Sequence, residues 1–186
     1  SRVSRGLGDV YKRQELDNGE KIFGESLIGK STKPINRIGC IPENPPALPV
    51  AIEAIRDADL IVLGPGSLFT SLLPNFLVPE IVEALLKNNS PKIYISNLMT
   101  QPGETDGLDV FQHIKSIERQ LLNFGVNTRI FNAILSQGEF ERSSLIDYYR
   151  SRGAEPVICN KGRLISDGYY VLQAPLYLSL IHISEP

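Results

Sequence analysis

The sequence has few of the residues that build covalent cross-links or metal centres. Its 186 residues include two cysteines, two histidines, one methionine and no tryptophan. Two cysteines do not make a disulfide framework or a zinc ribbon. Cys40 and Cys159 are therefore predicted to be buried thiols of a cytoplasmic protein.

Long apolar runs and an excess of one charge are also missing. No run approaches the roughly 20 apolar residues of a membrane span, so no such span is expected. The formal net charge is −2 and no basic face is visible, which argues against a nucleic-acid partner. With 42% hydrophobic and 22% charged residues, the composition is that of an ordinary globular domain.

The two ends of the chain are predicted not to belong to the fold. Residues 6–14 read GLGDVYKRQ and residues 178–186 read LSLIHISEP. One allowed codon choice for the first stretch has a reverse complement that translates, residue for residue, as the second. Such a match is expected of sequencing adapter translated at both ends of a DNA fragment; the alternative is a basic arm and an amphipathic tail. We assign residues 1–14 and 178–186 to non-native adapter and expect 15–177 to be the middle and C-terminal part of one domain.

Repeated alternation of strand and helix patterns predicts an α/β domain with a Rossmann-like, mostly parallel sheet and flanking helices. Parallel strands joined by helices form right-handed β-α-β units. The run LIVLG at 60–64 is typical of a strand covered on both faces. We expect a hairpin at 15–28, strands at 34–41, 60–64, 92–97, 128–135 and 154–160, and helices at 50–58, 78–88, 109–122 and 140–153.

The first candidate site follows the strand at 60–64. Residues 64–67 read GPGS, and the hydroxyl-rich LFTS follows. Ligands of open parallel sheets bind beyond the carboxyl ends of the strands. Glycines let the backbone approach a ligand, and the amides of residues 66–68, at the start of the next helix, would attract an anion. A phosphate or carboxylate fits this loop, but a tight turn with Ser67 as a helix N-cap is equally compatible.

The second candidate site is the stretch NLMTQPGETDG at 97–107. Asn97 and Thr100 offer hydrogen bonds to a ligand, and the Pro-Gly pair at 102–103 favours a type II turn. Nearby carboxylates could attract Mg²⁺, but near a helix start they more often cap the helix or interact with its dipole. A divalent site also needs more oxygen ligands than this segment guarantees, so no metal site is assigned. These carboxylates are Glu104, Asp106 and Asp109.

No nucleophile–base pair is visible in residues 15–177. His113 lies in a predicted helix without a matching Ser, Cys or acidic partner, which favours a surface or packing role. Tyr148 and Tyr149 lie in an Arg-rich helix. One of these rings is expected to pack inward, and the other to stack on a base or sugar or to lie at a solvated rim.

Together the two motifs resemble the bacterial gluconeogenesis-factor family, within the wider group of 2-phospho-L-lactate-transferase-like proteins. The longest matching stretches are ADLIVLGPGSLFTSLLPNFLVPEI at 58–81 and YISNLMTQPGETDG at 94–107. The resemblance spans 15–177 and implies a Rossmann-like fold with its ligand site at the strand ends. It also implies that the first strands, an N-terminal glycine-rich nucleotide loop and a C-terminal basic contact are missing from this chain.

The resemblance leaves alternative functions open. One branch supports growth and cell shape on gluconeogenic carbon sources and is associated with binding a UDP-sugar such as UDP-N-acetylglucosamine. The other transfers a phospholactyl group from an activated nucleotide to a deazaflavin in coenzyme F420 synthesis, using Mg²⁺. The forms GPGSLFTS and NLMTQPGET look like the first branch, so a cytoplasmic UDP-sugar-binding regulator is the main hypothesis. A scaffold whose loops only cap helices is the third, and whether the protein is an enzyme stays open.

Carried over residue by residue, the resemblance predicts a ligand- and phosphate-binding set without assigning a catalytic residue. No cofactor is implied, and Mg²⁺ is needed only under the transferase alternative. The expected partner is a nucleotide sugar, and the oligomeric state, homo-oligomer included, is left open. The predicted site residues are Gly64, Gly66, Ser67, Thr70, Ser71, Asn75, Asn97, Thr100, Gln101, Gly103, Glu104 and Tyr149.

Overall fold

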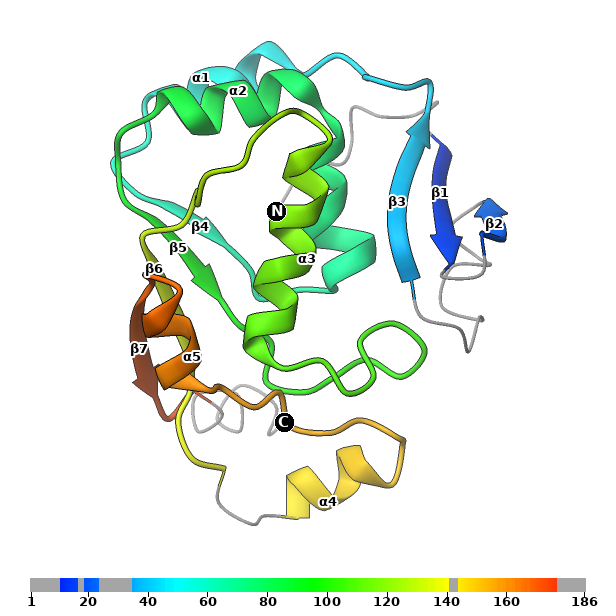
Figure 1. Ribbon diagram of the computed structural model, residues 1–186, viewed down its shortest axis with the longest axis vertical. Coiled ribbons are helices and arrows are strands. Elements are labelled where there is room, and N and C mark those ends of the chain that lie inside the picture. Colours follow the sequence, from blue (N-terminus) through cyan, green and yellow to red (C-terminus); the bar gives the residue numbers. More distant parts are fainter. Residues whose placement is uncertain (1–10, 17–18, 24–34, 141–143, 177–186) are drawn as a thin grey trace, which may run out of the picture.

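The chain forms an antiparallel sheet and a separate parallel sheet (Figure 1). The computed structural model describes residues 11–16, 19–23, 35–140 and 144–176. In the view of Figure 1 the antiparallel sheet and the parallel sheet lie on opposite sides of the long helix α3. The strands are β1 (Tyr11–Leu16), β2 (Lys21–Phe23), β3 (Ile35–Ile41), β4 (Ile61–Leu63), β5 (Lys92–Ile95), β6 (Ala133–Gln137) and β7 (Tyr170–Ala174).

The antiparallel sheet has the order β2-β1-β3. The turn between β1 and β2 is closed by backbone hydrogen bonds between Leu16 and Gly19 and between Leu16 and Glu20. The predicted hairpin and the strand at 34–41 are thus confirmed within the described residues. Strand β1 includes residues 11–14, which the sequence assigned to adapter; that assignment stays a prediction, and residues 1–10 and 177–186 lie outside the described residues.

The parallel sheet has the order β4-β5-β6-β7, with every neighbouring pair parallel. Leu63 pairs with Tyr94, Tyr94 with Ile134, and Ile134 with Val171. This arrangement confirms the predicted α/β fold class. It also brings the loops after β4 and β5 to the same edge of the sheet.

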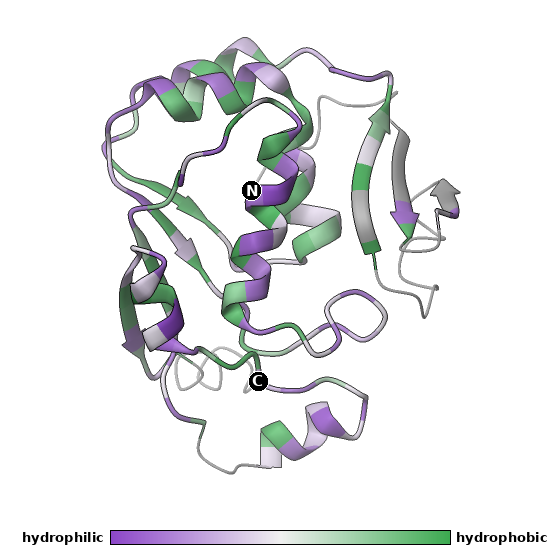
Figure 2. Cartoon of the chain, viewed as in Figure 1, coloured by the Kyte–Doolittle hydropathy of each residue, from purple (hydrophilic) through white to green (hydrophobic). Residues whose placement is uncertain are grey.

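Helices connect the parallel strands, and α3 shows most clearly why they form. Asp109 caps α3 by accepting from the Gln112 amide, and the Gln112 side chain accepts from the Asp109 amide in return, a capping box. The buried residues of α3 recur at helical spacing, and Figure 2 shows both hydrophilic and hydrophobic residues along it. The helices are α1 (Pro49–Arg56), α2 (Pro79–Lys87), α3 (Val110–Leu122), α4 (Ser144–Arg150) and α5 (Lys161–Ser166), with a π-helical turn η2 (Leu68–Leu72) and a 3₁₀ turn η3 (Leu73–Leu77).

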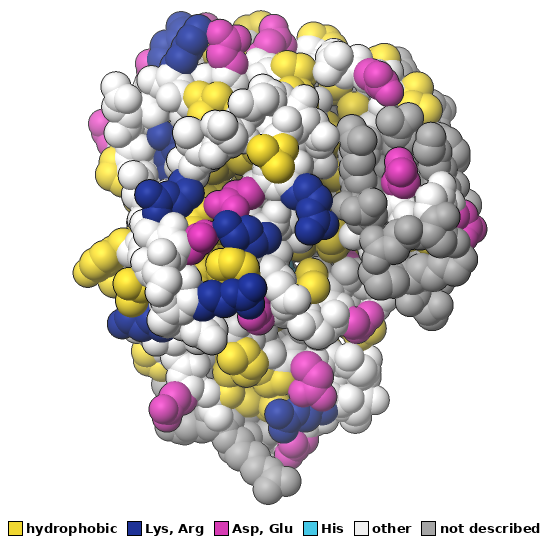
Figure 3. Space-filling model, viewed as in Figure 1, with side chains coloured by type: hydrophobic (Ala, Val, Ile, Leu, Met, Phe, Trp, Pro, Cys, Tyr) yellow, Lys and Arg dark blue, Asp and Glu magenta, His cyan; other side chains and the backbone are white. Residues whose placement is uncertain are grey.

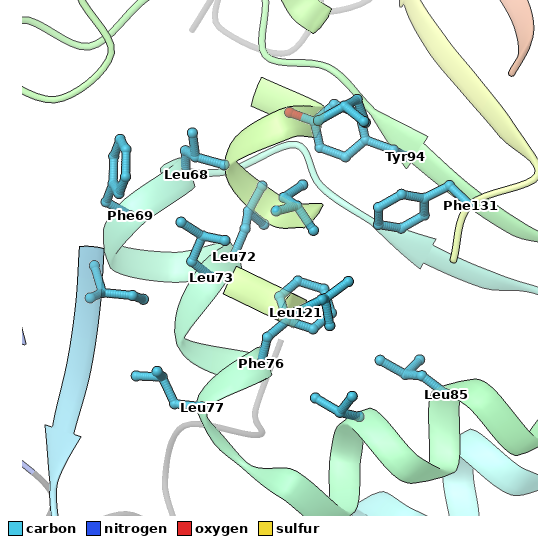
Figure 4. Close-up of a cluster of buried hydrophobic side chains, with 14 of the residues drawn as sticks. Leu68, Phe69, Leu72, Leu73, Phe76, Leu77, Leu85, Tyr94, Leu121 and Phe131 are labelled. Carbon is cyan, nitrogen blue, oxygen red and sulfur yellow. The ribbon is translucent and has the colours of Figure 1, made fainter. Parts of the chain in front are cut away.

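The segment directly after the first motif fills the centre of the core (Figure 4). Its side chains lie with those of Tyr94, Leu121 and Phe131 in one buried cluster. Each buried Leu or Phe contributes roughly 1.5–3 kcal/mol, so this burial holds the C-terminal side of the motif in place. The six residues are Leu68, Phe69, Leu72, Leu73, Phe76 and Leu77.

Among the described residues, the parallel sheet is covered on one face only. Tyr94 and Ile134 are fully buried, whereas Val62 is 48% exposed and Tyr170 is 67% exposed. The strand order advances in one direction, and right-handed crossovers then place the connecting segments on one face. The prediction that the strand at 60–64 is covered on both faces is therefore wrong for Val62.

The strand predicted at 154–160 does not form, and the segment does not join the sheet. Among the described residues, its one ladder contact is an isolated antiparallel bridge between Pro156 and Met99, and Pro156 has no amide to donate. The sheet is completed instead by β7, which no sequence pattern had indicated. The segment thereby pairs with the second motif.

Within the described residues, no single helix is long and apolar enough to cross a membrane. The pair Leu68–Leu77 and Pro79–Lys87, bent by 81° at its break, meets the length and composition criteria together. Much of its apolar surface, including Leu68 and Phe76, is buried in the core.

Candidate functional site

The first motif leaves β4 through a backbone turn that only glycine fits. Gly64 has φ +92°, and a Cβ added there would lie 2.4 Å from the Ile95 carbonyl oxygen of β5. The left-handed conformation alone disfavours other residues, and the contact with neighbouring backbone adds a steric clash. Gly64 thus lets the loop after β4 pass directly over the end of β5.

Ser67 begins the helical segment that follows. Its Oγ accepts from the Thr70 amide at 3.3 Å, which makes Ser67 the N-cap of η2. The backbone amides of Ser67 and Leu68 donate to no described residue. The N-cap interpretation of Ser67 is therefore confirmed. The Ser67 amide remains for a ligand, whereas Leu68 is fully buried.

Asn97 of the second motif holds the first motif through two hydrogen bonds to the backbone of Gly66. Its Oδ1 accepts from the Gly66 amide at 2.9 Å, and its Nδ2 donates to the Gly66 carbonyl at 2.8 Å. The side chain is buried at 9% exposure. The Gly66 amide, expected to face an anion, is thus already paired inside the protein.

A second link between the motifs is a serine–carboxylate hydrogen bond. Ser67 Oγ donates to Glu104 Oε2 at 2.7 Å, and Thr70 Oγ1 donates to Ser67 Oγ at 2.5 Å. The two partners of the first bond are 37 residues apart. This pair could not be predicted from the sequence, because neither motif indicates which residue of the other it contacts. Ser67 and Glu104 meet because the strands that precede them are neighbours in the sheet.

The second motif has its own internal hydrogen bonds. The Glu104 amide donates to the Gln101 carbonyl at 3.0 Å, and Gly103 has φ +83°, as at the third position of the predicted type II turn. The fully buried Thr105 accepts from the Gln101 amide, and Asp106 accepts from the Gly103 amide. Asp109 thus caps helix α3, as the sequence favoured, and Asp106 closes a turn of the second motif.

The segment at 154–160 holds the other side of the second motif. Thr100 is buried; its amide donates to the Glu155 carbonyl at 2.7 Å, and its Oγ1 accepts from the Glu155 amide at 2.9 Å. The Val157 amide donates to the Leu98 carbonyl at 2.9 Å. A Cβ at Gly153 would lie 3.6 Å from the Pro102 ring. The chain just after α4 is thereby placed against the predicted ligand loop.

The structure does not connect every predicted residue to this centre. Asn75 Nδ2 donates to the Ser71 and Leu72 carbonyls and so closes its own helical turn. Tyr149 lies on α4, with its ring centroid 5.7 Å from that of Tyr148. Both tyrosines are exposed, at 40% and 49%, so the expectation that one ring packs inward is wrong; Ile146 is the buried residue of that helix.

The electrostatic character of the two motifs is acidic and hydroxyl-rich. Neither stretch 64–71 nor 97–107 contains Lys or Arg, and no described basic residue forms an ion pair with Glu104. In the described ranges, no three His, Cys, Asp or Glu side chains are grouped so as to hold a metal ion. Gln101 Oε1 is buried and has no hydrogen-bond partner among the described residues.

His113 is fully buried near the start of α3. Its Nδ1 lies 2.8 Å from the Asp109 carbonyl, and Nε2 has no partner. Burial lowers the pKa of His113, which favours the neutral ring. Packing is thus its evident role, as the sequence indicated.

A cavity of about 440 Å³ lies away from both motifs, at the amino ends of β6 and β7. Lys115 bridges Glu118 and Asp167 there, at 2.6 and 2.8 Å, and Arg129 donates to the Asp167 carbonyl. Figure 3 shows acidic and basic side chains side by side on this face, over α3 and α5. None of the predicted site residues lines this cavity.

These features define an α/β protein whose candidate site is built by the loops at the carboxyl ends of two neighbouring parallel strands. The sequence profile of the family described as 2-phospho-L-lactate transferase CofD matches residues 8–177. The chain belongs to this family.

Relatives within the family carry a different name. The chain is 42% identical over 166 residues to the gluconeogenesis factor of Halalkalibacterium halodurans, covering 86% of this chain and 50% of that protein. It is 39% identical over 148 residues to the gluconeogenesis factor of Bacillus subtilis, covering 80% of this chain and 45% of that protein. A crystal structure of a Bacillus halodurans protein superposes with a TM-score of 0.82 at 39% identity, covering 89% of this chain and 52% of that one. The chain spans about half the length of these relatives.

Proposed function

We propose that this chain acts as a gluconeogenesis factor, a cytoplasmic regulatory protein that binds a UDP-sugar. In this role it supports growth and cell shape on gluconeogenic carbon sources. The names of its relatives support the first part. The observation that carries the binding role is the union of the two motifs, with Asn97 bonded to Gly66 and Ser67 bonded to Glu104.

The joined motifs offer several groups to a nucleotide sugar. The amide of the partly exposed Ser67 has no described partner and suits a phosphate oxygen. The exposed ring of Tyr149 suits stacking on a base or sugar, and the chain after α4 reaches the second motif.

Ligand binding tests this proposal directly. Isothermal titration with UDP-N-acetylglucosamine is performed on the 186-residue chain and on a chimera in which residues 15–177 replace the matching part of the Halalkalibacterium halodurans protein. We expect saturable binding in the chimera. Absence of UDP-sugar binding in both proteins would remove the proposed function.

A glycine variant locates the binding to the first motif. A Cβ at Gly66 would lie 3.3 Å from the Leu72 side chain, and the larger Gly66→Val also narrows the approach to the loop. We expect it to abolish binding while the circular dichroism spectrum is kept. Unchanged affinity would show that the phosphates do not lie on this loop.

A phospholactyl transferase acting on a deazaflavin is the second candidate, and the description of the matching family favours it. It is separated from the first by assaying both proteins with a deazaflavin, an activated phospholactyl nucleotide and Mg²⁺. Deazaflavin-dependent turnover without any response to a UDP-sugar would decide for the transferase.

A further inference from the structure

We propose that Glu104 makes this site select an uncharged hydroxyl group of its ligand, rather than a phosphate, beside the Ser67 hydroxyl. The inference rests on the proposed nucleotide-sugar function and assigns one part of that ligand to one side chain. Its starting point is the bond from Ser67 Oγ to Glu104 Oε2 at 2.7 Å.

The hydroxyl of Ser67 has no capacity left for a phosphate. A serine hydroxyl has one proton to donate and two lone pairs. Ser67 gives its proton to Glu104 and accepts from the amide and the hydroxyl of Thr70. A phosphate oxygen, which can only accept here, would receive this proton only if the Glu104 carboxylate moved away.

The negative charge of Glu104 also disfavours a phosphate at the Ser67 hydroxyl. No described Lys or Arg lies within ion-pair distance of it, and neither motif carries a basic residue. A phosphate placed at Ser67 would face this carboxylate at hydrogen-bonding range, where like charges repel. A phosphate is therefore disfavoured at the Ser67 hydroxyl.

The same carboxylate has room for a donor. An ionised carboxylate accepts about four hydrogen bonds, and the Glu104 side chain is half-buried with one described hydroxyl partner. A partly exposed carboxylate with no paired cation among the described residues suits the hydroxyl groups of a sugar, which donate without carrying charge.

The test compares a nucleotide sugar with the nucleotide alone. Kd values for UDP-N-acetylglucosamine and for UDP are measured for wild type and Glu104→Gln, in the chain and in the chimera described above. Glu53→Gln, an exposed position on α1, removes the same charge elsewhere and serves as the control. We expect Glu104→Gln to weaken the UDP-sugar about tenfold, or about 1.4 kcal/mol, and to leave UDP unchanged or bound more tightly.

Each outcome bears on the proposal. A smaller preference for the UDP-sugar in Glu104→Gln, absent in Glu53→Gln, supports it. An unchanged preference, or equal losses for both ligands, overturns the role of Glu104 and leaves nucleotide-sugar binding in place. If wild type and Glu104→Gln bind neither ligand, both this inference and the proposed function fail.

Discussion

The two motif loops lie side by side but are held in different ways. The second loop is closed by its own turn and is paired on its far side with the segment at 154–160. The first loop has the buried η2–η3 segment behind it, but its exposed turn depends on Asn97 of the second loop. The comparison shows that the second loop is a support and the first loop is the supported element.

The largest loss of stability is expected for a substitution at Gly64, where the first loop passes over the end of β5. Gly64→Ala places a Cβ 2.4 Å from the Ile95 carbonyl oxygen, in a residue with φ +92°. We expect a loss of about 3 kcal/mol or more in the free energy of unfolding, measured by urea titration. Gly107→Ala is the control, because its φ is +69° but its Cβ meets nothing within 4 Å; it should cost about 1–2 kcal/mol. Equal losses would show that the contact with β5 is unimportant.

The next effect tests the dependence of the first loop on the second. Asn97→Ala removes two hydrogen bonds to Gly66 and leaves the Gly66 amide without its acceptor. We expect a loss of about 2–3 kcal/mol, together with faster hydrogen exchange at the Gly66 amide and weaker binding of the UDP-sugar.

Asn75→Ala supplies the matched control for that variant. Its amide also makes two bonds to backbone carbonyls, but within its own helical turn. Exchange at residues 66–68 should then stay as in wild type. If Asn97→Ala also left exchange there unchanged, the first loop would hold its shape without the second.

Local chemistry could be predicted from the sequence, and long-range pairing could not. The capping residue Asp109, the spacing of Ile114 and Ile117 and the turn at 102–103 are written within a few neighbouring residues, and each formed as expected. The bond from Ser67 to Glu104 joins residues 37 apart and depends on the order of β4 and β5.

The segment at 154–160 and strand β7 show that long-range pairing could not be predicted for the fold either. The run at 154–160 has the apolar pattern of a strand, yet Pro156 cannot donate to a ladder, and the segment pairs with the second motif instead. The strand β7 (Tyr170–Ala174) completes the sheet in register with β6. Hydrophobic pattern alone does not distinguish this segment from a strand, because both bury apolar side chains; Val157 is 1% exposed.

The smallest loss of stability is expected for a substitution in the second loop, at Thr100. Thr100→Val keeps the shape of the side chain but removes the oxygen that accepts from the Glu155 amide at 2.9 Å. Because the backbone bond from Thr100 to Glu155 remains, we expect a loss of only about 1 kcal/mol in a urea titration. Hydrogen exchange should rise at Glu155 and stay unchanged at residues 66–68, since Asn97 still holds the first loop. Thr128→Val, at an exposed position, is the control and should leave the free energy of unfolding nearly unchanged. If hydrogen exchange in Thr100→Val rose equally in both loops, the second loop would not be an independent support of the first.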